Sequence, residues 1–364
     1  MKTIKDQNIT KPKKYTYFIG IDVSKNKLDY AVMRGNDLLF HREAKNEPAV
    51  ILDFINELKD FPGFTIRKAL FCMENTGIYC NHLIRSLSRL KGNIHVGHAL
   101  HIKRSLGLVR GKNDKIDAIR IVRYSWKNRD ELRLFGEKRL VITKLSALNS
   151  LRNRLTRVGV MVKTPLKEQS AFIDGVLQAE ILAGCELTDA AVKSDLKNLE
   201  DTIKRLINSD VQVKRLIQII TSVPGVGLVT ALQVLISTNE FKDISDPKKF
   251  ACYAGVAPFK SESGKETGLV KAKVSKAANK KVKSLLHICA VRAIQHDENL
   301  RAYYERKTTL EKKSKMLTIN AVRNKLILRI FACVRQDQCY CSDHVPDRFQ
   351  LTNHTPPPEV PDAC

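Results

Sequence analysis

The sequence has no long apolar run. No segment of its 364 residues approaches the roughly 20 consecutive apolar residues that a membrane-spanning helix needs. The N-terminal segment MKTIKDQNITKPKKY is basic, but it has neither the apolar stretch nor the cleavage site of a signal peptide. Nine scattered cysteines in a chain of this length form no disulfide scaffold. These absences argue against a membrane protein and a secreted one, and the expected location is a reducing cytoplasm.

Acidic residues are scarce relative to basic ones. The chain has 38 Asp and Glu against 63 Lys and Arg, a formal net charge of +25. Such an excess predicts a polyanionic partner, and nucleic acid is the commonest one. An acidic lipid surface is the alternative, but no strongly amphipathic basic helix stands out to support it. The remaining composition, 43% hydrophobic and 28% charged, is typical of a globular protein with two or three domains.

Residues 15–130 alternate between strand and helix patterns. Three β-branched and aromatic runs separated by short turns predict an antiparallel meander at 15–24, 27–34 and 37–44. Beyond the meander we expect, in order, a helix near 49–58, a strand at 67–75, a helix at 76–90, a strand at 93–99 and a helix at 114–128. This order predicts an α/β domain of the RNase H-like, or RuvC-like, fold.

The segment 131–220 is predicted to be helical. Its last part carries apolar residues at alternating spacings of three and four, interrupted by one aspartate: Leu196, Leu199, Ile203, Leu206, Asp210, Val213, Ile217 and Ile220. This heptad pattern is typical of a coiled coil and makes the segment a candidate assembly element. The alternative is one long helix that packs on its own domain.

The rest of the chain divides into a compact region and a tail. Residues 221–335 are predicted to form a mainly helical domain, and from Lys260 to Arg329 they hold 18 Lys and Arg against 6 Asp and Glu. The tail, 336–364, has few apolar residues, and we expect it to be disordered. Its cysteines and histidines are too irregularly spaced for zinc to be expected: Cys339, Cys341, His344, His354 and Cys364. A basic arm, 1–14, begins the chain.

Four carboxylates stand where acidic residues are unusual. Asp22 lies at the end of the first predicted strand, and Glu74 lies at the end of the fourth. Asp114 and Asp117 are three residues apart in the first turn of a predicted helix, which places them on one face. In an RNase H-like fold the first and fourth strands are neighbours and this helix crosses their ends. The four acids are therefore expected to converge.

Such a set predicts a metal centre. Carboxylate oxygens suit Mg²⁺ better than zinc, and two divalent ions about 4 Å apart would serve an in-line phosphoryl displacement. Each acid also has a structural interpretation: Asp22 can end a strand, Glu74 can cap the next helix, and Asp114 can stabilise a helix N-terminus. The combination of all four on suitable elements favours the metal interpretation.

A glycine-rich turn, VPGVG at 223–227, separates two helical patterns. Gly225 and Gly227 would permit a tight helix-to-helix turn, and the N–H groups that begin the next helix would suit a phosphate. The pattern resembles a helix-hairpin-helix, which binds the nucleic-acid backbone without reading sequence. A packing turn between two helices is the alternative.

A segment rich in serine and lysine follows the sequence YAGVAP at 253–258. Ser261 and Ser263 lie there in a predicted exposed loop, and composition alone gives a loop serine no catalytic role. The lysines are spaced for phosphate contacts more than for base reading, or else for a solvated helix face: Lys260, Lys265, Lys271, Lys273, Lys276, Lys280, Lys281 and Lys283.

A series of short motifs follows along the chain: GIDVSK, MENTGIY, GKNDKIDA, SVPGVG, YAGVAP, SGK and SKAANKKVKSLL. Their order over residues 15–335 resembles the DEDD transposases of the insertion-sequence 110 family, the Piv-like recombinases. The resemblance implies a RuvC-like N-terminal domain with an acidic tetrad at Asp22, Glu74, Asp114 and Asp117. It also implies a C-terminal transposase domain whose serine attacks DNA and forms a covalent intermediate. Ser263 matches that serine, with Ser261 as the fallback.

The resemblance further implies partners. Members of this family complete the tetrad of one subunit with the serine of another, so a homo-oligomer, dimer or tetramer, is expected, with the heptad segment as its assembly element. They use a structured noncoding bridge RNA whose loops pair with donor and target DNA, so base pairing supplies sequence and the protein supplies shape and charge. Two positions depart from the family pattern: His101 replaces a common Asn, and Asn113 replaces a common Thr.

The leading hypothesis is a Mg²⁺-dependent transposase that cleaves and exchanges DNA strands through Ser263. A second is a Holliday-junction or structure-selective nuclease that uses metal-activated water, and a third is a basic nucleic-acid-binding protein whose acids are structural. Ser263→Ala separates the first two, because a nuclease that uses water should survive it. Asp22→Asn separates both enzymes from the third, because only an enzyme would lose strand cleavage.

Overall fold

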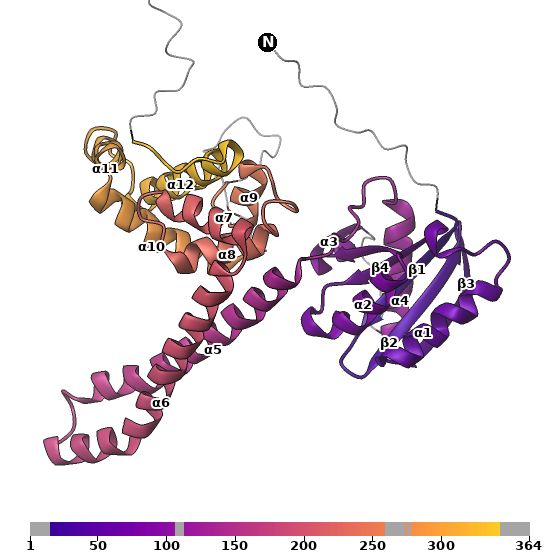
Figure 1. The fold of residues 1–364 in the computed structure, drawn as a ribbon, viewed down its shortest axis with the longest axis horizontal. Coiled ribbons are helices and arrows are strands. Elements are labelled where there is room, and N and C mark those ends of the chain that lie inside the picture. The colour runs from indigo at the N-terminus through magenta and orange to yellow at the C-terminus, as the bar shows by residue number, and fades with distance from the viewer. Residues whose placement is uncertain (1–14, 106–112, 259–273, 275–277, 343–364) are drawn as a thin grey trace, which may run out of the picture. The chain divides into compact units, whose positions relative to one another are not determined.

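The structure, a computed structural model, describes residues 15–105, 113–258, 274 and 278–342. Contacts within the chain divide it into two units, Met1–Glu137 and Lys138–Cys364. The first unit is built on a sheet and the second is helical (Figure 1). Among the residues described, no helix is both long and apolar enough to cross a membrane.

A mixed five-stranded sheet forms the first unit, in the order β3-β2-β1-β4-β5. The first three strands pair antiparallel, whereas β4 pairs parallel to β1 and β5 pairs parallel to β4. Their bounds are β1 Tyr17–Val23, β2 Lys27–Arg34, β3 Asp37–Lys45, β4 Ala69–Glu74 and β5 Asn93–Gly97. An antiparallel meander continued by parallel strands is the RNase H-like order, so the predicted RuvC-like α/β fold of this region is confirmed.

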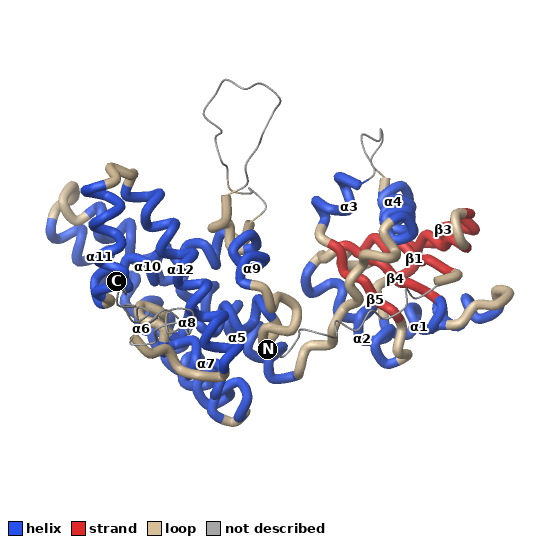
Figure 2. Tube along the Cα trace, turned by 90° about the horizontal axis from the view of Figure 1, so that it is seen from above, coloured by secondary structure: helices blue, strands red, loops and turns tan. Residues whose placement is uncertain are grey.

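Helices cover both faces of this sheet (Figure 2). Residues 19 and 21 of β1 pack in the core that holds α1 (Pro48–Glu57) and α2 (Asn81–Arg89), and residue 18 packs in the core of α4 (Asp114–Lys127). Alternate strand residues therefore serve alternate faces. The unit also contains α3 and three short 3₁₀ turns: α3 Ala99–Ser105, η1 Leu58–Asp60, η2 Ile66–Lys68 and η3 Gly77–Cys80.

Gly20 sets the distance between β1 and α4. A Cβ atom at this position would lie 2.2 Å from the backbone nitrogen of Val122 and 2.5 Å from the carbonyl oxygen of Ala118. Both neighbours are backbone atoms of α4, so no side chain fits here unless the helix moves. This contact fixes α4 across β1, two residues before Asp22 and on the same face of the sheet.

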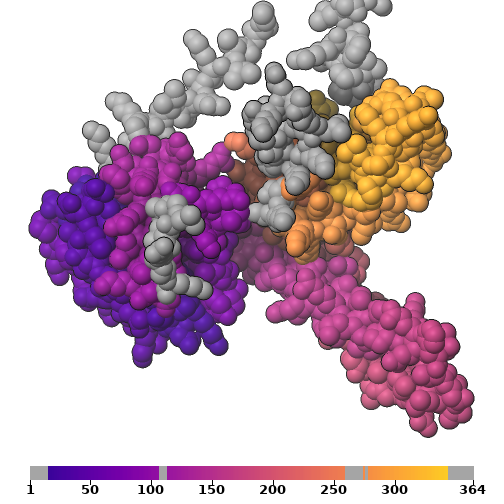
Figure 3. Space-filling model, turned by 180° about the vertical axis from the view of Figure 1, so that it is seen from behind, coloured from indigo at the N-terminus to yellow at the C-terminus, as the bar shows by residue number. Residues whose placement is uncertain are grey.

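The regular structure described in the second unit is helical: α5 Leu140–Gln169, α6 Gly175–Asn208, α7 Val211–Ser222, α8 Leu228–Thr238, α9 Pro247–Tyr253, α10 Lys280–His296, α11 Glu298–Glu305, the π-helix η4 Arg306–Leu310 and α12 Lys315–Gln336. One apolar core joins most of these helices, with members from α5 through α12 such as Leu145, Ile220, Leu235, Leu286 and Leu326. The helices α5 and α6 pair as a hairpin that extends beyond this core (Figure 3).

The heptad segment 196–220 is not one helix. Helix α6 ends at Asn208, and α7 begins after Asp210, whose carboxylate accepts a hydrogen bond from the backbone nitrogen of Val213 at 2.9 Å. Asp210 is therefore an N-cap, and the prediction of a continuous coiled coil through this residue is wrong. The apolar seam is buried in the core of its own unit, as the packing alternative predicted: Leu199, Ile203, Val213, Ile217 and Ile220.

Arg139 holds this helix joint in place. Its guanidinium donates two hydrogen bonds to Asp210, at 2.9 and 3.0 Å, and two to Glu240, at 2.6 and 3.0 Å. The Glu240 side chain is fully buried, and the hydrogen bonds from Arg139 hold the pKa of Asp210 below its ordinary value. One guanidinium thereby ties the start of α5 to the α6–α7 joint and to the end of α8.

Candidate active site

Three carboxylates lie at one end of the sheet, on the face that α4 covers. Asp22, near the end of β1, is paired directly with Asp29 of β2, so their side chains project from the same face. Glu74 ends β4, two residues after Cys72, which belongs to a core on this face with Ile121 of α4. Because β1 and β4 run parallel, their carboxyl ends meet at the same edge.

The start of α4 contributes the other two predicted acids. The Asn113 side chain accepts a hydrogen bond from the backbone nitrogen of Lys115 at 2.9 Å and so caps the helix. Asp114 and Asp117 follow in the first turn. Asn113, one of the two departures from the family pattern, therefore fills an ordinary capping role, for which Asn and Thr are both suited.

Electrostatics shows that the predicted acids are neighbours. The pKa of Asp22 is raised from 3.8 to about 6, first by burial and then by the charges of Asp117, Asp114, Asp29 and Glu74. Glu74 of β4 and Asp114 and Asp117 of α4 thus lie close enough for their charges to act on Asp22. A partly buried carboxylate surrounded by like charges is costly unless a cation compensates it. An oxygen-only donor set of this charge fits a hard divalent ion such as Mg²⁺.

Two basic side chains engage the acids of α4. The Lys27 ammonium lies 2.8 Å from Asp114, 3.0 Å from Glu43 and 3.5 Å from Asp29. Arg120 donates to Asp117 at 2.7 Å. With these pairs formed, the described part of the chain contains no group of three or more His, Cys, Asp or Glu side chains arranged to hold a metal ion.

Asp29, Lys27 and Arg120 were not predicted from the sequence. Asp29 is only 3% exposed, and the Nε2 atom of His41 lies 2.9 Å from its carboxylate. The alternation of side chains along a strand could have identified Asp29 and Lys27. Asp29 and Lys27 are two residues apart on β2, and the tight turn after β1 places Asp29 opposite Asp22. Arg120 was recognisable as the residue three positions after Asp117 on a helix.

The glycine turn joins α7 to α8. Gly225 has φ +81°, and a Cβ atom there would lie 2.5 Å from the carbonyl oxygen of Cys289 in α10. Gly225 is therefore required for packing against α10, whereas Gly227 is exposed at the start of α8, with open space around its Cα. A phosphate contact at either glycine stays a prediction.

Both ends of the segment that carries the serines and lysines are anchored. The Asn320 side chain donates to the carbonyl of Val256 at 2.8 Å, and the backbone nitrogen of Asn279 donates to the carbonyl of Tyr253 at 2.8 Å. The segment itself lies outside the described residues, and with it the predicted positions Ser261, Ser263, Lys260, Lys265, Lys271, Lys273 and Lys276. The arm 1–14 and the tail residues His344, His354 and Cys364 also lie outside them.

The remaining predicted lysines begin α10. Lys280 is exposed, and Lys281 and Lys283 are half-buried. Burial lowers the pKa of Lys281, and the nearby charges of Arg157 and Arg152 lower it further. A cluster of positive charges of this kind is typical of a phosphate-binding surface.

An RNase H-like sheet with acids at the ends of β1 and β4 and at the start of α4 defines a RuvC-like protein of the DEDD class. A DEDD-type IS110 family model, described as "Transposase", matches residues 19–169, and the model "Transposase IS116/IS110/IS902 family" matches residues 217–305. The chain belongs to the IS110-family transposases, and it is a DNA recombinase or transposase.

Two similar proteins, from Moraxella bovis and Streptomyces coelicolor, support this assignment. The "Pilin gene-inverting protein" of Moraxella bovis is 23% identical over 325 residues, which cover 88% of this chain and 96% of that protein. The "Insertion element IS110 uncharacterized 43.6 kDa protein" of Streptomyces coelicolor is 25% identical over 176 residues, 48% of this chain and 42% of that protein. A solved structure, "T. thermophilus RuvC in complex with Holliday junction substrate", is 11% identical with a TM-score of 0.26, covering 33% of this chain and 100% of that one. Nucleases of the DEDD, RuvC-like kind generally use divalent metal ions.

Proposed function

We propose that this transposase cleaves and rejoins DNA. Asp22, Glu74, Asp114 and Asp117 are the proposed ligands of a divalent metal ion, Mg²⁺, and Ser263 is the proposed nucleophile. The observation that carries the proposal is that Asp22 and Glu74 lie at the carboxyl ends of neighbouring parallel strands, with Asp114 and Asp117 of α4 close enough for their charges to raise the pKa of Asp22. Bound there, two Mg²⁺ ions would supply the positive charge that an in-line phosphoryl displacement needs.

The chain's own groups would then carry out strand exchange. The Ser263 hydroxyl oxygen would attack a DNA phosphorus, joining one strand end to the serine and releasing the other end as a hydroxyl. Attack by a hydroxyl of a second strand would break the serine–phosphorus bond, regenerate Ser263 and join the strands. Each step exchanges one phosphate ester for another, so no external source of energy is required.

Nucleic acids are the proposed partners: donor DNA, target DNA and a bridge-type noncoding RNA, with the protein acting in the cytoplasm. Base pairing would select the sequences, while the protein would hold the backbones through charge. The cationic start of α10 at Lys280, Lys281 and Lys283 supports backbone contact, and the exposed start of α8 at Gly227 supports a phosphate contact.

A covalent protein–DNA adduct tests this proposal. Purified protein is mixed with Mg²⁺, DNA flanking its gene and the transcript of the noncoding flank, and the products are run on a denaturing gel. We expect an adduct with wild type and with the matched control Ser261→Ala, and none with Ser263→Ala. An adduct that is lost with Ser261→Ala and kept with Ser263→Ala would identify Ser261 as the nucleophile. Cleavage without an adduct that survives Ser263→Ala would support a nuclease using water.

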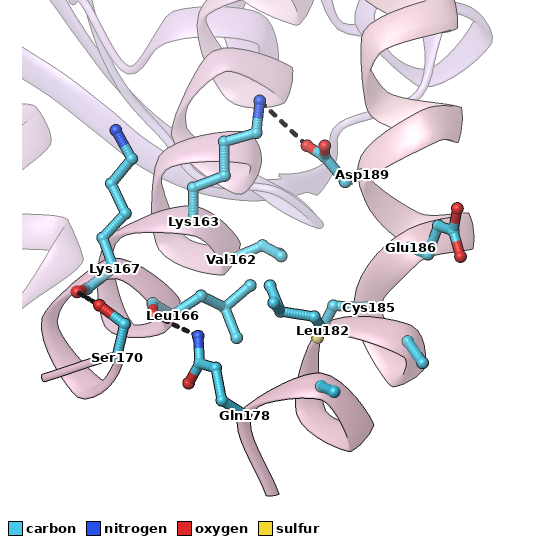
Figure 4. A pocket seen from close by; sticks show the side chains of 12 residues that line it. Val162, Lys163, Leu166, Lys167, Ser170, Gln178, Leu182, Cys185, Glu186 and Asp189 are labelled. Carbon is cyan, nitrogen blue, oxygen red and sulfur yellow. Dashed lines mark hydrogen bonds and ion pairs between the residues drawn. The ribbon is translucent and has the colours of Figure 1, made fainter. Parts of the chain in front are cut away.

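The far end of the α5–α6 hairpin is the proposed assembly surface. Large apolar side chains are exposed there on both helices and in the loop between them, among them Met161 at 74%, Phe172 at 88% and Leu187 at 85%. The two helices also line an open pocket of about 700 Å³, into which Val162, Leu166 and Leu182 point (Figure 4). Exposed apolar surface on this scale marks an interaction site. A second copy of this chain, with the same apolar hairpin, is the proposed occupant.

Introducing charge at this surface should dissociate the oligomer. For Met161→Glu combined with Leu187→Glu, we expect the dissociation constant to rise about a hundredfold or more, because two apolar contacts of about 1.5 kcal/mol each are lost. Light scattering after size exclusion measures the change in mass. Ser194→Glu, which adds a charge at an exposed polar position of α6, is the matched control and should leave the mass unchanged. A double variant with the wild-type mass would place the assembly surface elsewhere.

A further inference from the structure

Two basic side chains of the first unit lie directly on the acids of α4. Lys27 is on β2, and its Nζ atom lies 2.8 Å from Oδ2 of Asp114 and 3.0 Å from Oε2 of Glu43. Arg120 lies one turn along α4 and donates from Nη1 to Oδ1 of Asp117 at 2.7 Å. Two of the four acids of the site are thus in ion pairs with cations of the chain itself.

These ion pairs oppose metal binding. A carboxylate oxygen at hydrogen-bond distance from an ammonium or guanidinium group is oriented toward that group, and the same cation repels a divalent ion on the same carboxylate. The acids influence the pKa of Asp22, whereas no three ligating side chains of the described chain are positioned to hold an ion. Each pair engages one carboxylate oxygen of Asp114 or Asp117 and so lowers the affinity of that acid for a divalent ion.

Phosphate oxygens are suitable competitors for both cations. The Lys27 side chain is 37% exposed and the Arg120 side chain is 25% exposed, so each can reach a ligand from solvent without unfolding of the sheet or of α4. Lysine carries its charge on a flexible four-carbon stem, and arginine presents a planar fork that matches phosphate geometry. A phosphodiester at the edge of the sheet would therefore offer each cation an alternative anion.

We propose that Lys27 and Arg120 are exchangeable counter-ions that couple metal binding to nucleic-acid binding. In the free protein each neutralises one acid of α4. When nucleic acid binds, each moves to a backbone phosphate, and Asp114 and Asp117 become available to the metal. This proposal rests on the proposed function, because it takes the four acids as the metal ligands. Linkage makes the coupling reciprocal, so nucleic acid and metal each strengthen the binding of the other.

Equilibrium binding of Mn²⁺ to the full-length protein tests the coupling. The electron paramagnetic resonance signal of free Mn²⁺ is measured with and without a short DNA duplex, and metal bound by the duplex alone is subtracted. We expect the duplex to tighten Mn²⁺ binding to wild type about fivefold or more. Lys27→Met combined with Arg120→Met should bind Mn²⁺ more tightly than wild type without DNA, by a similar factor, and should gain nothing further from the duplex. Structural damage would weaken metal binding, not tighten it.

Lys45→Met is the matched control, because Lys45 is exposed on β3 directly opposite Lys27. It removes the same charge and should leave both Mn²⁺ affinities unchanged. A double variant that binds Mn²⁺ no more tightly than wild type, or a wild type whose affinity ignores DNA, overturns the counter-ion proposal.

Asp22→Asn distinguishes this failure from failure of the proposed function. If Mn²⁺ binding survives Asp22→Asn unchanged, the acids do not form the metal site and the proposed function itself fails. If Asp22→Asn abolishes Mn²⁺ binding while the Lys27→Met, Arg120→Met double variant binds Mn²⁺ as wild type does, only the counter-ion proposal fails.

Discussion

Asp22→Asn should stabilise the metal-free protein while abolishing strand cleavage. The pKa of Asp22 is about 6 in the folded protein against an ordinary value of 3.8, so between these values the folded state holds a proton that the unfolded state has lost. Stability therefore falls as the pH rises from 4 to about 6, and the cost is constant above that range. At pH 7.5 the asparagine variant should be more stable by about 2 kcal/mol, the full shift being reduced for solvent screening.

Thermal unfolding in a metal chelator, followed at several pH values, measures this effect. The difference between wild type and Asp22→Asn should grow from near zero at pH 4 to its maximum above pH 6. Strand cleavage should fall by about a thousandfold or more, because metal-assisted charge stabilisation is worth several kcal/mol. Nucleic-acid binding should persist. A variant that is less stable than wild type at every pH would show that Asp22 has a structural role, as expected of a non-catalytic binding protein.

Gly20→Ala should destabilise the first unit more than any ordinary surface substitution. The added methyl group would meet backbone atoms of α4 at 2.2 and 2.5 Å, and a whole helix has to shift to relieve the contact. We expect a loss of about 3–5 kcal/mol, a large share of the stability of a typical domain. Urea unfolding measures the loss, and amide hydrogen exchange in α4 shows whether this helix is the element released.

Gly184→Ala is the matched control for this change. Gly184 is exposed within α6, and a Cβ atom there meets nothing within 4 Å. The same substitution should therefore stabilise the second unit by about 0.5–1 kcal/mol, because alanine is the better helix former. If Gly20→Ala is tolerated as well as Gly184→Ala, then α4 does not cross β1 at this residue.

The sequence predicted the fold of the first unit well because its strands are short apolar runs bounded by clear turns. The predicted strand 27–34 coincides with β2, and the expected helix at 114–128 corresponds to α4. Helix α3 was missed because Ile102 is its one buried residue, which leaves no periodic pattern to read. In the second unit, α6 and α7 both face one core, so their apolar spacing continues across Asp210 and hides the break between them.

The sequence predicted the acids of the candidate site but not the cations that pair with them. The acids could be predicted because a carboxylate at the end of an apolar strand is energetically costly unless it is paired or bound to metal. The cations could not, because the contact between Lys27 and Asp114 joins β2 to a helix far along the chain and depends on how closely α4 approaches the sheet. Assignment of the nucleophile to Ser263 rests on the motif order alone and stays a prediction.

The connectivity of the sheet has a consequence for how the protein acquires its activity during synthesis. Parallel pairing of β1 with β4 must wait until two strands and a helix between them have been made, and α4 comes later still. Such long-range pairing forms slowly compared with local contacts. Because the acids proposed as metal ligands come from β1, β4 and α4, the proposed centre can be complete only after these three elements have packed together. A first unit in which α4 has not yet packed on the sheet would therefore lack the proposed centre.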